Sequence, residues 1–212
     1  MLRLFIVRHG ITVWNRESRM QGHTDVPLSD EGVRQAHALS ARLSEMHLDQ
    51  VWSSDLQRAR ATAEIIAERH GLEVRTSDRL REQMLGEWEG LTAEEIVERG
   101  DGERLLAYRR DSIVHRPPGS EPLDAVWDRV TGAMAEIRAA ATAGHVLVVG
   151  HGGCMRAPLC EAMGASVASM RRIWLDNASL SLIEYGPERC WIRLLNDTSH
   201  LGPLTLPPPY TA

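Results

Sequence analysis

Four short groups of residues in this 212-residue chain could together bind an anion and transfer a group from it. They are Arg8-His9-Gly10, the stretch from Ser53 to Arg58, the acidic stretch from Glu82 to Glu89, and Gly150-His151-Gly152-Gly153. Imidazole is a nucleophile and a proton carrier, guanidinium binds phosphate or carboxylate oxygens, and a carboxyl group moves protons. The residue types therefore predict chemistry on a phosphate or a carboxylate.

The two histidines each follow an apolar run that predicts a buried strand. Residues 2–7 precede Arg8 and His9, and residues 145–149 precede the glycine-rich turn around His151. Ligands of parallel α/β sheets bind beyond the carboxyl ends of the strands. We therefore expect His9 and His151 to meet at one edge of a sheet, with Gly10 letting the backbone approach the ligand.

The other two groups are less specific on their own. Arg58 is expected in the first turn of a helix, where free backbone N–H groups also attract an anion, although an ordinary surface arginine gives the same pattern. Glu82, Glu87 and Glu89 could each transfer a proton, and the pattern does not choose among them. The loop after His9 adds polar groups suited to phosphate oxygens, at Thr12, Asn15, Gln21 and Gly22.

Taken together, these groups resemble the histidine phosphatase superfamily, which includes phosphoglycerate mutases and many small-molecule phosphatases. The R-H-G-x-T-x-x-N signature stands at residues 8–15, S-x-L-x-R-A ends at Arg58-Ala59, and L-x-E ends at Glu82 before G-x-W-E-G. The G-H-G-G turn is residues 150–153. The resemblance covers residues 2–195, with all four elements in the family's order.

The resemblance implies a mechanism in which His9 attacks phosphorus and becomes a phosphohistidine. Arg8, Arg58 and His151 would surround the phosphoryl group with positive charge, and Glu82 would give the leaving group its proton. The substrate-binding residues implied are Asn15, Thr12, Gln21, Gly22, Gly152 and Arg109. No cofactor and no metal are expected.

Several alternatives stay open at this level. A phosphoglycerate mutase is the main alternative to a phosphatase; the extra stretch that closes mutase sites is missing here, but Arg109-Arg110 could bind a substrate carboxylate as paired arginines do in mutases. An exposed helix face is the competing interpretation of that pair. A silent phosphate-binding protein is a third class.

A metal-dependent hydrolase is a further alternative. Its imagined ligands are His9, His23, Asp25, Glu82 and His151. Against it, no paired zinc-ligand spacing occurs, and neighbouring arginines would repel a cation.

The elements that must position these residues alternate between strands and helices. Helices are expected over residues 29–46, 55–70, from residue 92, and over 123–143 with a stop at Gly144; short strands are expected over 50–52, 179–184 and 191–195. This order predicts an α/β fold, a three-layer α/β/α sandwich with a mostly parallel central sheet, phosphoglycerate mutase-like. We expect one domain over residues 1–202, a small cap around residues 83–122, and a Pro-rich tail over 203–212 that is extended or disordered.

Composition limits the partners. The net charge is −5 without a long basic run, which disfavours nucleic acid, and no apolar stretch is long enough for a membrane span. All 24 basic residues are Arg, so lysine Schiff bases and the lysine phosphate loop are excluded. The N-terminus fits a first strand better than a signal peptide, and three cysteines cannot all pair, so we expect a cytoplasmic protein. The partner expected is a small phosphorylated metabolite, and the resemblance implies a possible homodimer.

Overall fold

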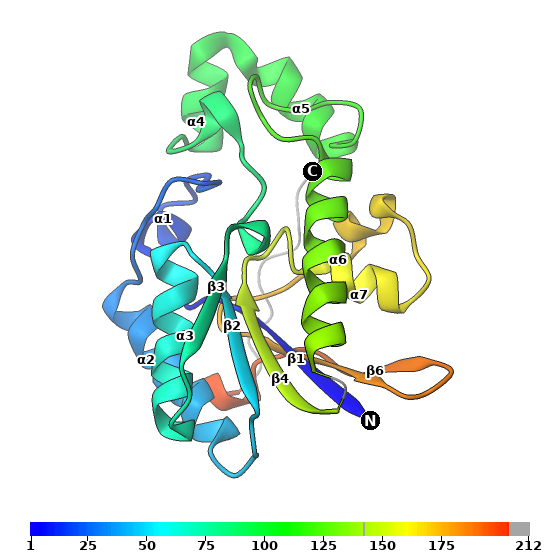
Figure 1. Cartoon of the computed structure of the whole chain (residues 1–212). Helices are drawn as coiled ribbons and strands as arrows, with labels where there is room; N and C mark the ends of the chain where they lie inside the picture. Colours follow the sequence, from blue (N-terminus) through cyan, green and yellow to red (C-terminus); the bar gives the residue numbers. More distant parts are fainter. Residues whose placement is uncertain (142, 204–212) are drawn as a thin grey trace.

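A six-stranded sheet forms the centre of the computed structural model, which describes residues 1–141 and 143–203 (Figure 1). The strand order is β3-β2-β4-β1-β5-β6. The strands are β1 (Leu2–Arg8), β2 (Gln50–Ser54), β3 (Val74–Ser77), β4 (Gly144–Gly150), β5 (Leu180–Tyr185) and β6 (Cys190–Asp197). β3, β2, β4 and β1 run parallel, whereas β5 is antiparallel to both β1 and β6. The mostly parallel sheet is confirmed.

Helices cover both faces of the sheet. This is needed because successive apolar residues of a strand point to opposite faces, so each face must be covered. On β1, Phe5 and Val7 pack with α2 (Asp30–Leu43) and α3 (Gln57–His70), while Leu4 and Ile6 pack with α6 (Leu123–Ala140) and α7 (Arg156–Ala162). Each strand of the centre therefore contributes to two apolar clusters, one on each side. The predicted three-layer arrangement is confirmed.

Local capping signals place several helix ends. The Ser29 side chain accepts a hydrogen bond from the backbone N–H of Gly32, Gly71 ends α3 in the left-handed conformation, and Thr92 with Glu95 forms a capping box at α4 (Ala93–Ile96). The helix after residue 123 ends at Ala140, however, and Gly144 begins β4 instead of stopping the helix. Glycine suits that strand start because its φ is 102°.

Other boundaries also differ from the expectation. α2 ends at Leu43 rather than near residue 46, α3 begins at Gln57, and β3 was not expected at all. The predicted Pro-rich tail lies outside the described residues except for residue 203. Within the described residues, no helix combines the length and the apolar character that a bilayer span needs.

A small helical cap lies beyond the carboxyl ends of the parallel strands, drawn in green at the top of Figure 1. It contains η2 (Gly86–Trp88), α4, η3 (Val97–Asp101) and α5 (Gly102–Arg110). Trp88, Ile96 and Leu105 form an apolar cluster of their own there. The Trp88 indole N–H donates to Asp101 at 3.1 Å, and its ring meets the Tyr108 ring edge to face. The remaining short helices are α1 (Val13–Arg16), η1 (Asp78–Leu80), η4 (Val167–Arg172) and η5 (Ser199–Leu201).

Candidate active site

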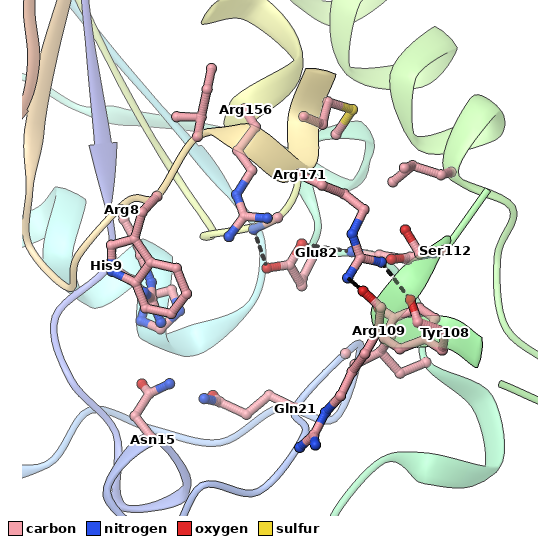
Figure 2. A pocket seen from close by; sticks show the side chains of 18 of the residues that line it. Arg8, His9, Asn15, Gln21, Glu82, Tyr108, Arg109, Ser112, Arg156 and Arg171 are labelled. Carbon is pink, nitrogen blue, oxygen red and sulfur yellow. Dashed lines mark hydrogen bonds between the residues drawn. The ribbon is translucent and has the colours of Figure 1, made fainter. Parts of the chain in front are cut away.

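A cavity of about 600 Å³ lies between the cap and the carboxyl ends of β1 and β4 (Figure 2). The β1–β4 register pairs Arg8 with Gly150, so the residues that follow these two strands are neighbours. Seven arginines and a single carboxylate, Glu82, line the cavity within the described residues. The arginines are Arg8, Arg19, Arg58, Arg109, Arg156, Arg171 and Arg172. Such an excess of guanidinium groups suits an anionic ligand.

His9 is a buried imidazole with a defined tautomer. Its Nδ1 lies 2.7 Å from the carbonyl oxygen of Gly10, which can only accept, so Nδ1 carries the proton and Nε2 keeps its lone pair. Burial lowers the pKa of His9 well below its ordinary value, and the charges of Arg58 and Arg8 lower it further. His9 is therefore a neutral imidazole whose Nε2 can act as a nucleophile.

His151 packs against His9 with ring centroids 5.1 Å apart and rings inclined by 64°. The Arg58 Nε–H donates to Nδ1 of His151 at 3.2 Å, which requires a lone pair on that nitrogen. Burial, followed by the charge of Arg58, lowers the pKa of His151 well below its ordinary value. His151 is therefore a neutral N–H donor at Nε2, a buried atom without a partner among the described residues, and the positive charge comes from the arginines.

Arg58 and Arg8 are both anchored to backbone carbonyls. Arg58 donates to the carbonyl oxygens of Thr24 and Gly22 at 2.9 and 2.8 Å. Arg8 donates through Nη1 to the Leu175 carbonyl at 2.6 Å, while its buried Nε has no partner within the described residues. Burial lowers the pKa of Arg8 to about 10, so it stays charged at neutral pH.

Two glycines of the Gly150–Gly153 turn make room for charged side chains. A Cβ on Gly152 would lie 3.0 Å from Arg8 Nε, and a Cβ on Gly153 would lie 2.4 Å from Glu82 Oε1. The turn therefore brings its backbone against both the guanidinium and the carboxylate. Gly10 differs from the expectation, because it faces the backbone of Gly32 rather than the cavity; a Cβ there would lie 2.5 Å from the Gly32 carbonyl oxygen.

Glu82 is the acidic residue that reaches the cavity. Its Oε2 accepts from the Gly153 N–H at 2.8 Å, and its Oε1 accepts from the N–H groups of Cys154 and Gln83, both at 2.9 Å. The Glu89 carboxylate, by contrast, accepts hydrogen bonds from the protein backbone and does not line the cavity. Burial raises its pKa, but hydrogen bonds from His23, Thr24 and Leu85 outweigh this and leave the pKa lowered.

The backbone around Glu82 is held by Arg129 of α6. Arg129 donates to the carbonyl oxygens of Arg79, Arg81 and Glu82 at 2.9, 2.7 and 2.8 Å. Its other N–H groups form a bidentate pair with Glu121 at 2.7 and 2.8 Å. His23 adds a contact of 2.8 Å from its Nε2 to the Glu82 carbonyl. These bonds fix the main chain that presents the Glu82 carboxylate. Glu87, the third acidic candidate, is exposed to solvent.

The remaining expected site residues divide into two sets. Asn15, Gln21, Gly22 and Arg109 line the cavity. Thr12 does not: it caps α1, and both its backbone N–H and its hydroxyl donate to Asn15 Oδ1, at 3.0 and 3.1 Å. Because Asn177 also donates to that oxygen, the amide nitrogen of Asn15 is the group turned to the cavity (Figure 2). Gly152 does not line the cavity either; it lies against the Arg8 side chain. Arg110 is exposed to solvent.

Two of the imagined metal ligands are engaged elsewhere. His23 contacts the Glu82 carbonyl, and Asp25 accepts from the backbone N–H of Gln57 at 2.7 Å. Among the described residues, no three His, Cys, Asp or Glu side chains are grouped so that they could hold a metal ion.

Comparison with known proteins identifies the family of this chain. The profile of the histidine phosphatase superfamily (branch 1) matches residues 4–198. The chain belongs to the histidine phosphatase superfamily. It is 38% identical over 202 residues to phosphoserine phosphatase 1 of Hydrogenobacter thermophilus, covering 95% of each chain. It is also 38% identical over 202 residues to phosphoglycerate mutase-like protein 4 of Arabidopsis thaliana, covering 93% of this chain and 86% of that protein.

A solved superfamily structure shares the whole fold. The mycobacterial glucosyl-3-phosphoglycerate phosphatase in complex with VO3 superposes with a TM-score of 0.84 at 34% identity, over 92% of this chain and 99% of that chain. The fold predicted from the resemblance is therefore confirmed.

Beyond the superfamily motifs, sequence reasoning missed several cavity residues. Tyr108 and Ser112 from the cap, Arg156 from α7, and Arg171 and Trp174 from the segment before β5 all line the cavity. Trp14 and Trp88 do not line the cavity; Trp88 is buried in the cap. None of these residues carried a sequence signal of its own, because only the fold brings them to the cavity.

Proposed function

We propose that this chain is a phosphomonoesterase that hydrolyses small phosphorylated metabolites through a phosphohistidine on His9. The observation that carries the proposal is the tautomer of His9, whose Nδ1–H faces the Gly10 carbonyl and leaves a lone pair on Nε2 beside two buried guanidinium groups. The names of the similar proteins, a phosphoserine phosphatase and a glucosyl-3-phosphoglycerate phosphatase, agree with this reaction class.

In the first step, the His9 Nε2 lone pair forms a bond to phosphorus while the ester P–O bond breaks. Arg8, Arg58 and the Nε2–H of His151 bind the phosphoryl oxygens, and the Asn15 amide adds a neutral donor. These groups stabilise charge on the transferring group without having to reorganise. Glu82 gives a proton to the leaving alkoxide.

In the second step, water attacks the phosphohistidine. Glu82, now a carboxylate, takes the proton from the attacking water, the N–P bond breaks, and inorganic phosphate leaves. The three backbone N–H groups around Glu82 hold the carboxylate in one place through both steps. The site supplies its own positive charge, so we propose that the reaction needs no metal and no cofactor.

A cofactor-dependent phosphoglycerate mutase is the second candidate. Arg109 lines the cavity and could bind a substrate carboxylate, and a mutase-like relative is among the similar proteins. The two candidates share the phosphohistidine and differ in whether water or a second substrate hydroxyl accepts the phosphoryl group.

One experiment tests the proposal and separates the two. A panel of phosphomonoesters is incubated with the chain in excess chelator, released phosphate is measured, and 2- and 3-phosphoglycerate interconversion is followed in parallel. We expect phosphate release, an acid-labile phosphoenzyme, and loss of both in His9→Ala, with the exposed His37→Ala as control. Rapid interconversion with little free phosphate would establish the mutase, and full activity in His9→Ala would refute both.

A further inference from the structure

Arg171 connects the main body of the protein to the cap. It lies near the end of η4, between Met170 and Ile173, which are buried in the apolar cluster that contains residues of α6 and α7. Its guanidinium reaches the other way, to the carboxyl end of α5 (Figure 2). The backbone of Arg171 is therefore fixed by the body of the protein, while its charged end contacts the cap.

The Arg171 guanidinium binds the last turn of α5 through two hydrogen bonds. Nη1 donates to the carbonyl oxygen of Tyr108 at 2.7 Å, and Nη2 donates to that of Arg109 at 2.8 Å. Carbonyl groups in the last turn of a helix have no partner within the helix, and the partial negative charge of that end attracts a cation. Arg171 supplies both the donors and the charge, so it stabilises the end of α5 from more than 60 positions away.

The ring of Tyr108 extends this contact into the interior of the cap. The guanidinium carbon of Arg171 lies 5.4 Å from the centre of the Tyr108 ring, a cation–π distance. The same ring meets the Trp88 ring edge to face, with centroids 5.6 Å apart, and Trp88 is a member of the apolar cluster of the cap. A continuous series of contacts therefore runs from η4 to the centre of the cap.

The two residues that Arg171 holds also line the cavity. Tyr108 and Arg109 are both among the cavity residues, and their backbone carbonyls are the acceptors of the Arg171 guanidinium. The other helix of the cap, α4, is fastened by a different arginine, because Arg19 donates to Glu95 at 2.6 Å. At the α5 end, the position of Tyr108 and Arg109 in the cavity wall is therefore set by Arg171.

We propose that Arg171 is a positioning residue, which holds α5 so that Tyr108 and Arg109 stay in place around the alcohol part of the substrate. The proposal rests on the proposed function for the orientation of the ester, with phosphorus at His9 and the alcohol part extending toward the cap. Both Nη atoms of Arg171 bind backbone carbonyls, so it acts through α5. It should therefore affect the binding of the alcohol part and leave the phosphoryl pocket unchanged.

The kinetic test uses 4-nitrophenyl phosphate as substrate and inorganic phosphate as competitive inhibitor, because phosphate fills the phosphoryl pocket alone. Arg171→Gln should raise KM for 4-nitrophenyl phosphate about 5- to 20-fold, with kcat and the inhibition constant of phosphate within about 3-fold of the unmodified chain. Arg171→Lys keeps the charge but not the planar pair of donors, so its KM should rise to a similar value. Arg104→Gln, on the same helix, loses an exposed pair with Asp101 and is the matched control.

Three kinetic results would overturn the proposal. A KM for Arg171→Lys equal to that of the unmodified chain would show that the charge of Arg171 is sufficient. An equal rise in KM and in the inhibition constant of phosphate would show that the substitution acts on the phosphoryl pocket. An unchanged KM in both variants would show that substrate binding does not depend on Arg171.

Hydrogen exchange tests the contact without any turnover. Backbone amides of α5 should exchange about 10-fold faster in Arg171→Gln than in the unmodified chain, whereas those of β1 and β4 keep their rates, and Arg104→Gln should change neither. This result in a chain that hydrolyses no phosphomonoester would remove the proposed reaction and keep Arg171 as the residue that holds α5. Unchanged exchange in an active enzyme would keep the reaction and remove this contribution of Arg171. If Arg171→Gln does not fold, Arg171→Lys provides the same comparison.

Discussion

The Nε–H of Arg58 faces Nδ1 of His151 across 3.2 Å, and this contact determines which nitrogen of His151 carries the proton. A guanidinium cannot accept a hydrogen bond, so Nδ1 must. The N–H of His151 is then Nε2–H. Arg58 thereby contributes its own charge and also sets the donor that its neighbour presents.

Replacing Arg58 should affect catalysis through both of these contributions. We expect Arg58→Gln to lower kcat about 100- to 1,000-fold, the loss typical of removing one donor to a reacting oxygen. Steady-state kinetics with a thermal melt measure this, and Arg60→Gln is the matched control, because Arg60 lies on the same helix in an exposed pair with Glu64. A loss below about 3-fold in Arg58→Gln would contradict the assigned contact.

The two buried histidines should make stability depend on pH. Unfolded histidine has a pKa of about 6.5, and both folded pKa values are lowered, so the unfolded chain binds more protons in the window below about 6.5. The free energy of unfolding therefore decreases as the pH falls through that window, by up to about 1.4 kcal/mol per pH unit for each histidine. Urea midpoints between pH 8 and pH 5 measure the slope.

The controls for the pH series are single substitutions. His9→Asn should reduce the slope, whereas His37→Asn, at an exposed position, should leave it unchanged. The same lowered pKa keeps Nε2 of His9 unprotonated, so the acid limb of kcat/KM should lie below pH 6.5. Identical slopes in the unmodified chain and His9→Asn would show that His9 is not the group responsible.

Replacing Glu82 should have an effect that depends on the leaving group. With an alkyl phosphate, Glu82→Gln should lower kcat about 100- to 10,000-fold, because the leaving alkoxide then has no proton donor. With 4-nitrophenyl phosphate the loss should be smaller, since that phenolate leaves readily without a proton. The exposed Glu87→Gln serves as control. The same loss for both substrates would argue against Glu82 as the proton donor.

Arg129 should act on catalysis through the position of Glu82. Removing it takes the Arg129 hydrogen bonds from Glu121 and from three carbonyl oxygens, and because the pair is half-buried we expect Arg129→Gln to cost about 1–3 kcal/mol of stability. In the folded fraction, kcat should fall with the leaving-group dependence of Glu82→Gln while KM changes little. Arg79→Gln, which loses only an exposed pair with Glu136, is the comparison. If the loss of kcat in Arg129→Gln did not depend on the leaving group, Arg129 would contribute to stability but not to the position of Glu82.

Much of this site could be predicted because its central residues are fixed by local structure. His9 follows β1 directly and His151 follows β4 directly, and the apolar runs that define these strands are unambiguous in the sequence. The close approach to the ligand that the sequence predicted for Gly10 is not found, because Gly10 packs against Gly32; it is Gly152 and Gly153 that make room for charged side chains, those of Arg8 and Glu82.

The residues that could not be predicted depend on contacts between distant parts of the chain. Residue types alone did not choose Glu82 over Glu89, although the family resemblance did; in the structure Glu82 is oriented by the N–H groups of Gly153 and Cys154, more than 70 positions away. β3 contains a single apolar residue, Val74, and so lacks the pattern of a strand. Arg156 has the pattern of an ordinary helix arginine, and only the tertiary fold brings it beside Glu82, Tyr108 and Arg171.

The cap has an apolar cluster of its own, separate from the two clusters on the sheet. Trp88, Ile96 and Leu105 stabilise the cap without sharing side chains with the two clusters on the sheet. Substitutions within α4 and α5 can therefore change the shape of the cap while the imidazole and guanidinium groups at the sheet edge keep their positions. Duplicated copies of such a gene can therefore acquire different substrates by substitutions in the cap alone, with the proposed phosphoryl chemistry retained.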